Sequence, residues 1–146
     1  MKLLKFAVAS MLSVSAFGAE AGVYTDDLTK CLVSKTNADD RTALVRWMFI
    51  AMTQHPVVAD LSNAKQIDVD KASATAGALF TRLLTEACVD AARSAIKYEG
   101  AAAIQASFGV LGQVASADLF SDPKVNEVMA GLEKHIDQEK IATLAK

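Results

Sequence analysis

The chain has 146 residues, 52% of them hydrophobic and 22% charged, with a formal net charge of −2 at pH 7. This composition suits one domain with a hydrophobic core, and the acidic balance argues against a nucleic-acid-binding protein, which presents a basic stripe to phosphates. No stretch rich in Gly, Ser and Pro interrupts the sequence, so we expect neither a linker nor a second domain.

The first twenty or so residues have the pattern of a secretory signal peptide. Lys2 and Lys5 supply a positive start, residues 6–17 form an apolar run, and the small residues Ala19 and Ala21 follow at the spacing of a signal peptidase site. The apolar run is shorter than the roughly 20 residues of a membrane-spanning helix. The segment is therefore expected to direct export and to be removed.

This interpretation makes residues 1–21 a signal peptide and residues 22–146 a single helical domain, with the mature chain starting near Glu20 or Gly22. Cleavage before Glu20 removes two lysines and no acid, which leaves a net charge of about −4. We expect a periplasmic or secreted protein without stable membrane insertion.

Export places the two cysteines, Cys31 and Cys88, in an oxidising compartment, where they are expected to form a disulfide bond. A redox-active pair is normally close in sequence, as in Cys-x-x-Cys, so the wide separation favours a structural role. Closing a loop of nearly sixty residues would stabilise the fold by roughly 4 kcal/mol in the chain-entropy model.

Apolar residues recur at helical spacing through almost the whole mature chain, and no segment alternates apolar and polar residues as a half-buried strand does. The sequence therefore predicts an all-α protein, a compact bundle of about five helices with one disulfide. The predicted helices are Asp26–Lys35, from after Asn37 to His55, from Asp68 or Asp70 to Glu99, Ala101–Leu119, and a last helix after Asp122.

Local signals mark the ends of the first three helices. Thr25 is the expected N-cap of the first, and Asp39 and Asp40 lie at the positive end of the second helix dipole. Pro56 stops the second helix, because the residue before a proline avoids helical geometry. Gly100 supplies the C-terminal stop of the third.

Residues 43–52 of the second helix are apolar nearly all round. A helix of this kind is buried on most sides, so we expect it at the centre of the bundle. Arg46 interrupts this run, and because a guanidinium keeps its proton, it must either extend to the surface or meet a carboxylate. The following segment, Val57–Asp70, is predicted to be a loop with a short helical turn.

The fourth helix has no charged residue from Ala101 to Ala117, so it lies inside the fold or against a partner, and Gly109 and Gly112 would let a neighbouring backbone approach. The last helix starts after Asp122, an N-cap ahead of a proline at the favoured first position. Its apolar stripe comprises Val125, Val128, Met129, Leu132 and Ile136, continued by Ile141 and Leu144.

Few residues have the spacing of a catalytic, metal-binding or phosphate-binding site. The two histidines, His55 and His135, have no partner at the i+3 or i+4 spacing of a helical metal site, and the sequence contains no phosphate-binding glycine loop or nucleophile elbow. We expect no catalytic residue, no metal ion and no cofactor.

The best candidate for a polar site is the cluster Asp39, Asp40, Arg41 and Arg46. A ligand contact is one interpretation of this cluster. An internal salt bridge is the favoured one, since an arginine among apolar residues usually needs a carboxylate within its own chain.

In outline, the export signal, the helical domain and the long-range pair Cys31 and Cys88 resemble those of small exported bacterial proteins. Two such groups are the immunity proteins that neutralise type VI secretion effectors in the periplasm and the small periplasmic acid-stress chaperones. Residues 46–56 and 109–113 also resemble uncharacterised proteobacterial periplasmic proteins. The resemblance implies a fold and a compartment and assigns no functional residue.

These observations favour a non-enzymatic binding or inhibitory protein, immunity-like in kind, that holds a protein partner through the Val57–Asp70 loop or an exposed apolar patch. The alternative is a periplasmic stress chaperone that exposes apolar surface when acid protonates its carboxylates. An enzyme or a small-ligand carrier is less expected, nucleic acid is not an expected partner, and self-association stays open.

Overall fold

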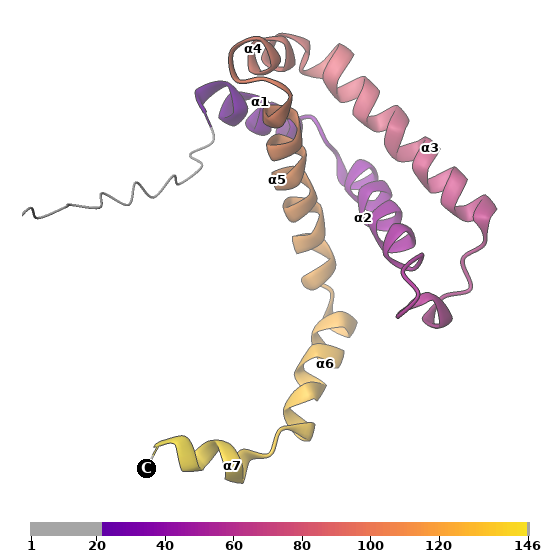
Figure 1. The fold of residues 1–146 in the computed structure, drawn as a ribbon, viewed down its shortest axis with the longest axis vertical. Coiled ribbons are helices and arrows are strands. Elements are labelled where there is room, and N and C mark those ends of the chain that lie inside the picture. Colours follow the sequence, from indigo (N-terminus) through magenta and orange to yellow (C-terminus); the bar gives the residue numbers. More distant parts are fainter. Residues whose placement is uncertain (1–21, 146) are drawn as a thin grey trace, which may run out of the picture.

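The computed structural model describes residues 22–145, and these residues form seven α-helices and no strand (Figure 1). The helices are α1 (Val23–Ser34), α2 (Ala38–Met52), α3 (Gln66–Arg82), α4 (Val89–Glu99), α5 (Ala101–Phe120), α6 (Pro123–Gly131) and α7 (Gln138–Ala142). Short 3-10 turns occupy Ala59–Leu61, Leu132–His135 and Thr143–Ala145, and a π-helical turn occupies Leu83–Ala87. The all-α prediction is confirmed, whereas the predicted signal peptide, residues 1–21, lies outside the described residues.

The expected number of about five helices is wrong, because two of the predicted helices are each divided. The third is interrupted by the π-helical turn, in which the Cys88 N–H donates to the Leu83 carbonyl at 2.8 Å, and Cys88 itself leaves helical geometry at φ −126°. Figure 1 shows α4 turning away from α3 at this point. The last helix is divided between Gly131 and Asp137, where a 3-10 turn ends and the Asp137 carboxylate caps α7.

The centre of the fold is α5, which packs against α1, α2 and α4. Its buried residues are small or medium in size and recur every four positions, so that neighbouring helices approach one face closely: Ala103, Ser107, Leu111 and Ala115. Leu28 and Leu32 of α1 are fully buried beside this face. Gly109 does not provide the expected close approach, because nothing lies within 4 Å of the position that a Cβ would take.

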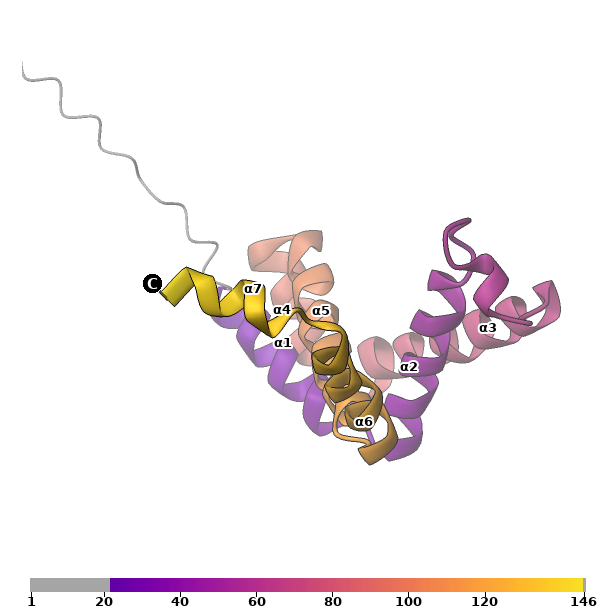
Figure 2. The same cartoon turned by 90° about the horizontal axis from the view of Figure 1, so that it is seen from below.

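The prediction that α2 is the buried central helix is wrong. Leu44 is its only buried residue, whereas Phe49 and Met52 are 56% and 61% exposed. The reason is that, among the described elements, α2 packs only against α3 and α5, and a helix needs neighbours on every side to bury an apolar surface that runs all round. With α3 it forms a helical hairpin that diverges from the α1, α4 and α5 group (Figure 2).

Several helices begin or end at the residues that the sequence predicted. The Asn37 side chain accepts from the Asp40 N–H, and the Asp40 carboxylate accepts in return from the Asn37 N–H, which is a capping box at the start of α2. Gly100 adopts φ 81° between α4 and α5, a conformation that favours glycine. Asp122 caps α6 by accepting from the N–H groups of Lys124 and Val125.

Other helix ends differ from the prediction. Thr25 is not an N-cap but lies in the first turn of α1, which begins at Val23. Helix α2 ends at Met52, before the expected His55. In place of an Asp68 N-cap, the Asp68 carboxylate lies inside the first turn of α3 and reaches back to the Lys65 N–H at 2.9 Å.

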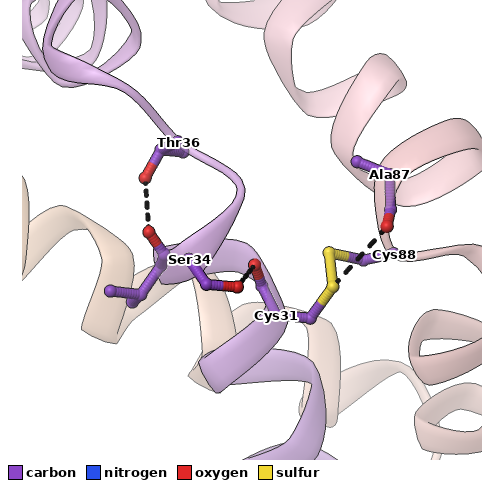
Figure 3. Close-up of a disulfide and its surroundings, with 6 residues drawn as sticks. Cys31, Ser34, Thr36, Ala87 and Cys88 are labelled. Atoms are coloured by element: carbon purple, nitrogen blue, oxygen red, sulfur yellow. Dashed lines mark hydrogen bonds between the residues drawn. A yellow bond between two sulfur atoms is a disulfide. The ribbon is translucent and has the colours of Figure 1, made fainter.

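The predicted disulfide is confirmed. Cys31 of α1 and Cys88, between α3 and α4, are bonded with their Cα atoms 5.9 Å apart (Figure 3). The Ser34 hydroxyl donates to the Cys31 carbonyl at 2.9 Å. The bonded Cys31 sulfur has no hydrogen to donate, so its approach to the Ala87 carbonyl oxygen at 3.7 Å is a packing contact. The bond fixes α1 against the junction between α3 and α4.

Residues 122–145, which we call the C-terminal arm, pack little against the rest of the fold. Helix α6 contacts the end of α5, and α7 contacts only the 3-10 turn that follows it, among the described elements. Figure 1 shows the arm extending beyond α5, away from α1 and α4. No helix within residues 22–145 is both long and apolar enough to cross a membrane.

Candidate functional site

The predicted polar cluster separates into different contacts. The Arg82 guanidinium of α3 donates to the Asp40 carboxylate at 2.8 Å, and the Arg41 guanidinium donates to the Asp118 carboxylate of α5 at 2.6 Å. Two adjacent residues thus connect α2 to two different helices, through partners outside the predicted cluster. Asp39 is exposed in the first turn of α2. Asp40 and Arg41 therefore hold the helices together.

Arg46 is exposed and extends to the surface, where it lines two cavities. It forms no ion pair with any other residue that the structure describes. The first cavity, of about 260 Å³, lies between α2 and α3 and is also lined by Asp68 and Lys71. The second, of about 440 Å³, lies between α2, α5 and the start of α6.

The charges around these cavities differ in how far they are already paired. The first cavity is lined by two cations, Arg46 and Lys71, and one anion, Asp68, which also caps α3, so its lining carries one net positive charge. In the second, Arg41 and Asp118 are paired with each other, and Asp122 balances the charge of Arg46. The arrangement can receive an anionic group, such as a carboxylate, between α2 and α3.

Glu99, at the end of α4, holds the start of α1 and was not predicted. Its carboxylate accepts from the Tyr24 N–H at 2.9 Å, the Thr25 N–H at 2.8 Å and the Thr25 hydroxyl at 2.5 Å. The hydroxyl, opposed in part by burial and aided by the two N–H groups, lowers the pKa of Glu99 below its ordinary value. Gly22 lies so close that a Cβ there would collide with this carboxylate.

No sequence signal could have indicated this contact, because Glu99 and Thr25 are 74 positions apart and lie on different helices. The same is true of Arg82 and Asp118 as partners of the polar cluster. Side chains that cap or pair across the fold depend on the packing of the helices, whereas a sequence pattern reports only neighbours within one helix.

Large apolar side chains gather around the end of the α2 and α3 hairpin. Five of them are 56–77% exposed and together form what we call the hairpin-end surface: Phe49, Met52, Val57, Leu61 and Ile67. Part of the predicted contact loop, Val57–Asp70, contributes to this surface. Isolated exposed apolar residues are common, but a contiguous group on neighbouring elements is typical of a contact site.

A second group of exposed apolar side chains follows the stripe predicted on the last helix. These side chains are 37–85% exposed on the C-terminal arm: Val128, Met129, Leu132, Ile136, Ile141 and Leu144. The apolar residues of the stripe lie on the C-terminal arm as the sequence predicted, but none of the described helices outside the arm covers these six side chains.

Both histidines are exposed and lie on separate elements. The His55 Nδ1 accepts from the Val57 N–H at 3.3 Å in the turn after α2, and His135 ends the 3-10 turn after α6. Within residues 22–145, no group of three or more His, Cys, Asp or Glu side chains is placed to hold a metal ion.

Comparisons with protein families, characterised proteins and solved structures found no significant match. The resemblance to immunity proteins and acid-stress chaperones therefore stays a prediction.

Proposed function

We propose that the mature chain is an exported, non-enzymatic binding protein that holds a protein partner through the hairpin-end surface, as an immunity protein does by occupying its target. The observation that supports the proposal is the exposure of five large apolar side chains around one loop. An edge-to-face contact between Trp47 and Phe80 and the ion pair of Arg82 with Asp40 hold α2 against α3. These contacts set the positions of the two helices that carry the surface.

The energetics agree with a moderate interface. At about 25 cal/mol per Å² and on the order of 100 Å² for each side chain, burying the exposed parts of the five residues contributes roughly 8 kcal/mol. The partner buries a similar apolar area, and association costs about 4–15 kcal/mol, so buried area alone does not set the affinity. Polar contacts at the edge of the surface contribute further affinity.

Arg46 and Lys71 are the residues best placed to supply it. Arg46 lies one helical turn from Phe49 on α2, and Lys71 lies one turn from Ile67 on α3. Both line the same cavity between the helices. A matching partner therefore has an apolar centre and a carboxylate at its edge, and each charge-assisted hydrogen bond to that carboxylate adds about 1.5–3 kcal/mol.

The test is capture from periplasmic extract by immobilised mature protein at about 1 μM, a concentration that retains a partner of micromolar affinity. The wild-type chain should retain a specific protein, and the double variant Val57→Asp, Leu61→Asp should lose it. Val23→Asp is the matched control, because Val23 is 72% exposed on α1, far along the chain from the hairpin. Absence of any specific partner, or equal loss with the control, contradicts the proposal.

An acid-stress chaperone is the second candidate, and one observation favours it. Three polar contacts between helices far apart in sequence depend on a carboxylate: Glu99 to α1, Asp40 to α3, and Asp118 to α2. Acid that protonates these carboxylates would weaken the contacts and release apolar surface. The mature protein would then suppress aggregation of an unfolded client near pH 3 but not at pH 7, and no protection at pH 3 would exclude this role.

A further inference from the structure

We infer that the mature chain begins at Gly22 and that its α-ammonium group binds the Glu99 carboxylate, so that removal of the signal peptide completes the attachment of α1 to α4. The inference rests on export, which is one part of the proposed function, and not on the hairpin-end surface or its partner.

Glu99 lies where its own helix disfavours a negative charge. It is the last residue of α4, and the C-terminal end of a helix dipole is negative. The N–H groups of Tyr24 and Thr25, at the positive end of α1, stabilise the carboxylate instead. Tyr24 also stacks on Tyr98, with the ring centroids 4.7 Å apart. The start of α1 and the end of α4 therefore meet around an anion.

The Glu99 carboxylate can accept one more hydrogen bond. A carboxylate offers about four acceptor positions, two on each oxygen. Oε2 of Glu99 accepts from the N–H and the hydroxyl of Thr25, whereas Oε1 accepts from the Tyr24 N–H. Within residues 22–145, no lysine, arginine or histidine side chain forms an ion pair with Glu99. The further donor that suits Oε1 is therefore a cation.

Gly22 lies against Oε1. Of the carboxylate atoms, Oε1 is the nearest to the position that a Gly22 Cβ would take, so a side chain at this position would displace the carboxylate. The Gly22 nitrogen is bonded to the same Cα. A peptide nitrogen directs one hydrogen in a fixed direction, but an ammonium group carries three around a rotatable bond. A free amino group at Gly22 can therefore turn a hydrogen toward Oε1.

The sequence places a cleavage site at the same residue. Ala19 and Ala21 are the small residues that a signal peptidase requires three positions and one position before the new N-terminus, if that terminus is Gly22. Cleavage before Glu20 would instead put the bulky Phe17 at the first of these positions. It would also leave two residues between the amino group and Gly22. Both the cleavage pattern and the position of Glu99 thus favour Gly22.

The first measurement is the intact mass of the protein purified from cells that express the complete chain. A product of residues 22–146 supports the inference. A product that begins at Glu20, or at another residue, overturns the inference and leaves export intact. A product that keeps residues 1–21 overturns export as well.

The second measurement is a double-mutant cycle of melting temperatures that does not depend on export. Chains released from a fusion protein begin at Gly22 or with one extra glycine before it, which replaces the ammonium group by a neutral amide. With Glu99 present, the extra glycine should lower the melting temperature by about 1–4 °C. In the Glu99→Gln variant this difference should vanish or reverse, because the ammonium group then faces the positive end of α1 without an anion.

Glu127→Gln is the matched control. Glu127 is an exposed residue of α6, so this variant should keep the full effect of the extra glycine. An extra glycine that changes the melting temperature equally with and without the Glu99 carboxylate overturns the pairing, as does an extra glycine that has no effect in the wild type.

Discussion

Removal of the disulfide gives a test of what holds α1 in place. In the double variant Cys31→Ala, Cys88→Ala, the unfolded chain regains the freedom of a loop spanning 57 positions. The chain-entropy relation gives a loss of about 14 cal/mol/K, or about 4 kcal/mol at 25 °C. Alanine is the appropriate replacement because Cys88 is only 3% exposed, and a serine hydroxyl there would be buried.

The variant should remain folded, because other contacts also hold α1. Leu28 and Leu32 are fully buried, and the Glu99 carboxylate binds the first turn of the helix. A typical domain has a stability of about 5–15 kcal/mol, so a loss of about 4 kcal/mol lowers the urea midpoint without unfolding the protein at 25 °C.

Urea denaturation followed by far-UV circular dichroism measures the change. The oxidised wild type and the variant should differ by about 3–4 kcal/mol, and the wild type treated with reductant should match the variant. Equal unfolding free energies, within about 0.5 kcal/mol, would refute the entropic reasoning. They would show that burial and the Glu99 contact alone determine the docking of α1.

Four further variants test local features. The Thr25 hydroxyl lowers the folded-state pKa of Glu99 below 4.5. The ionised Glu99 carboxylate therefore stabilises the fold above that pH, and this stabilisation is lost as the pH falls through the lowered pKa. Glu99→Gln should flatten the decline of the melting temperature below about pH 5. Gly100→Ala should destabilise by about 1–3 kcal/mol, because φ 81° with ψ −175° is a conformation that is essentially restricted to glycine. Gly109→Ala has open space for its Cβ in α5 and should stabilise by up to about 1 kcal/mol in the same urea assay. Leu111→Ala should cost about 2–5 kcal/mol, since Leu111 is fully buried in the central helix, and a cost under about 1 kcal/mol would contradict the assignment of α5 as the core.

The helix boundaries that could be predicted are those set by neighbouring residues. Asn37 and Asp122 cap helices through N–H groups two or three positions away, and Gly100 ends α4 through its own backbone freedom. The disulfide was also predictable, because two cysteines in a chain predicted to be exported allow a single pairing.

The boundaries that could not be predicted depend on distant contacts. The π-helical turn Leu83–Ala87 redirects the chain so that Cys88 meets Cys31, yet the residues of that turn continue the apolar stripe without interruption. The actual cap of α1 is Glu99, which the sequence marks only as the last residue of another helix. Of the predicted polar cluster, Asp40 and Arg41 find their partners on α3 and α5, and periodicity within α2 carries no information about either.

The prediction that α2 is buried was wrong for the same reason that the stripe on the C-terminal arm is exposed, and that reason bears on function. Sequence periodicity indicates which face of a helix is apolar, but whether that face is buried depends on whether the same chain supplies a neighbour. Residues 22–145 supply no cover for Phe49 on α2 or Val128 on α6, and both side chains are more than half exposed. Water does not stabilise such faces, so a chain that keeps two of them on different elements is suited to two separate contacts. The variants Val57→Glu and Val128→Glu separate them: the first should abolish partner capture at the hairpin-end surface, and the second should leave this capture intact.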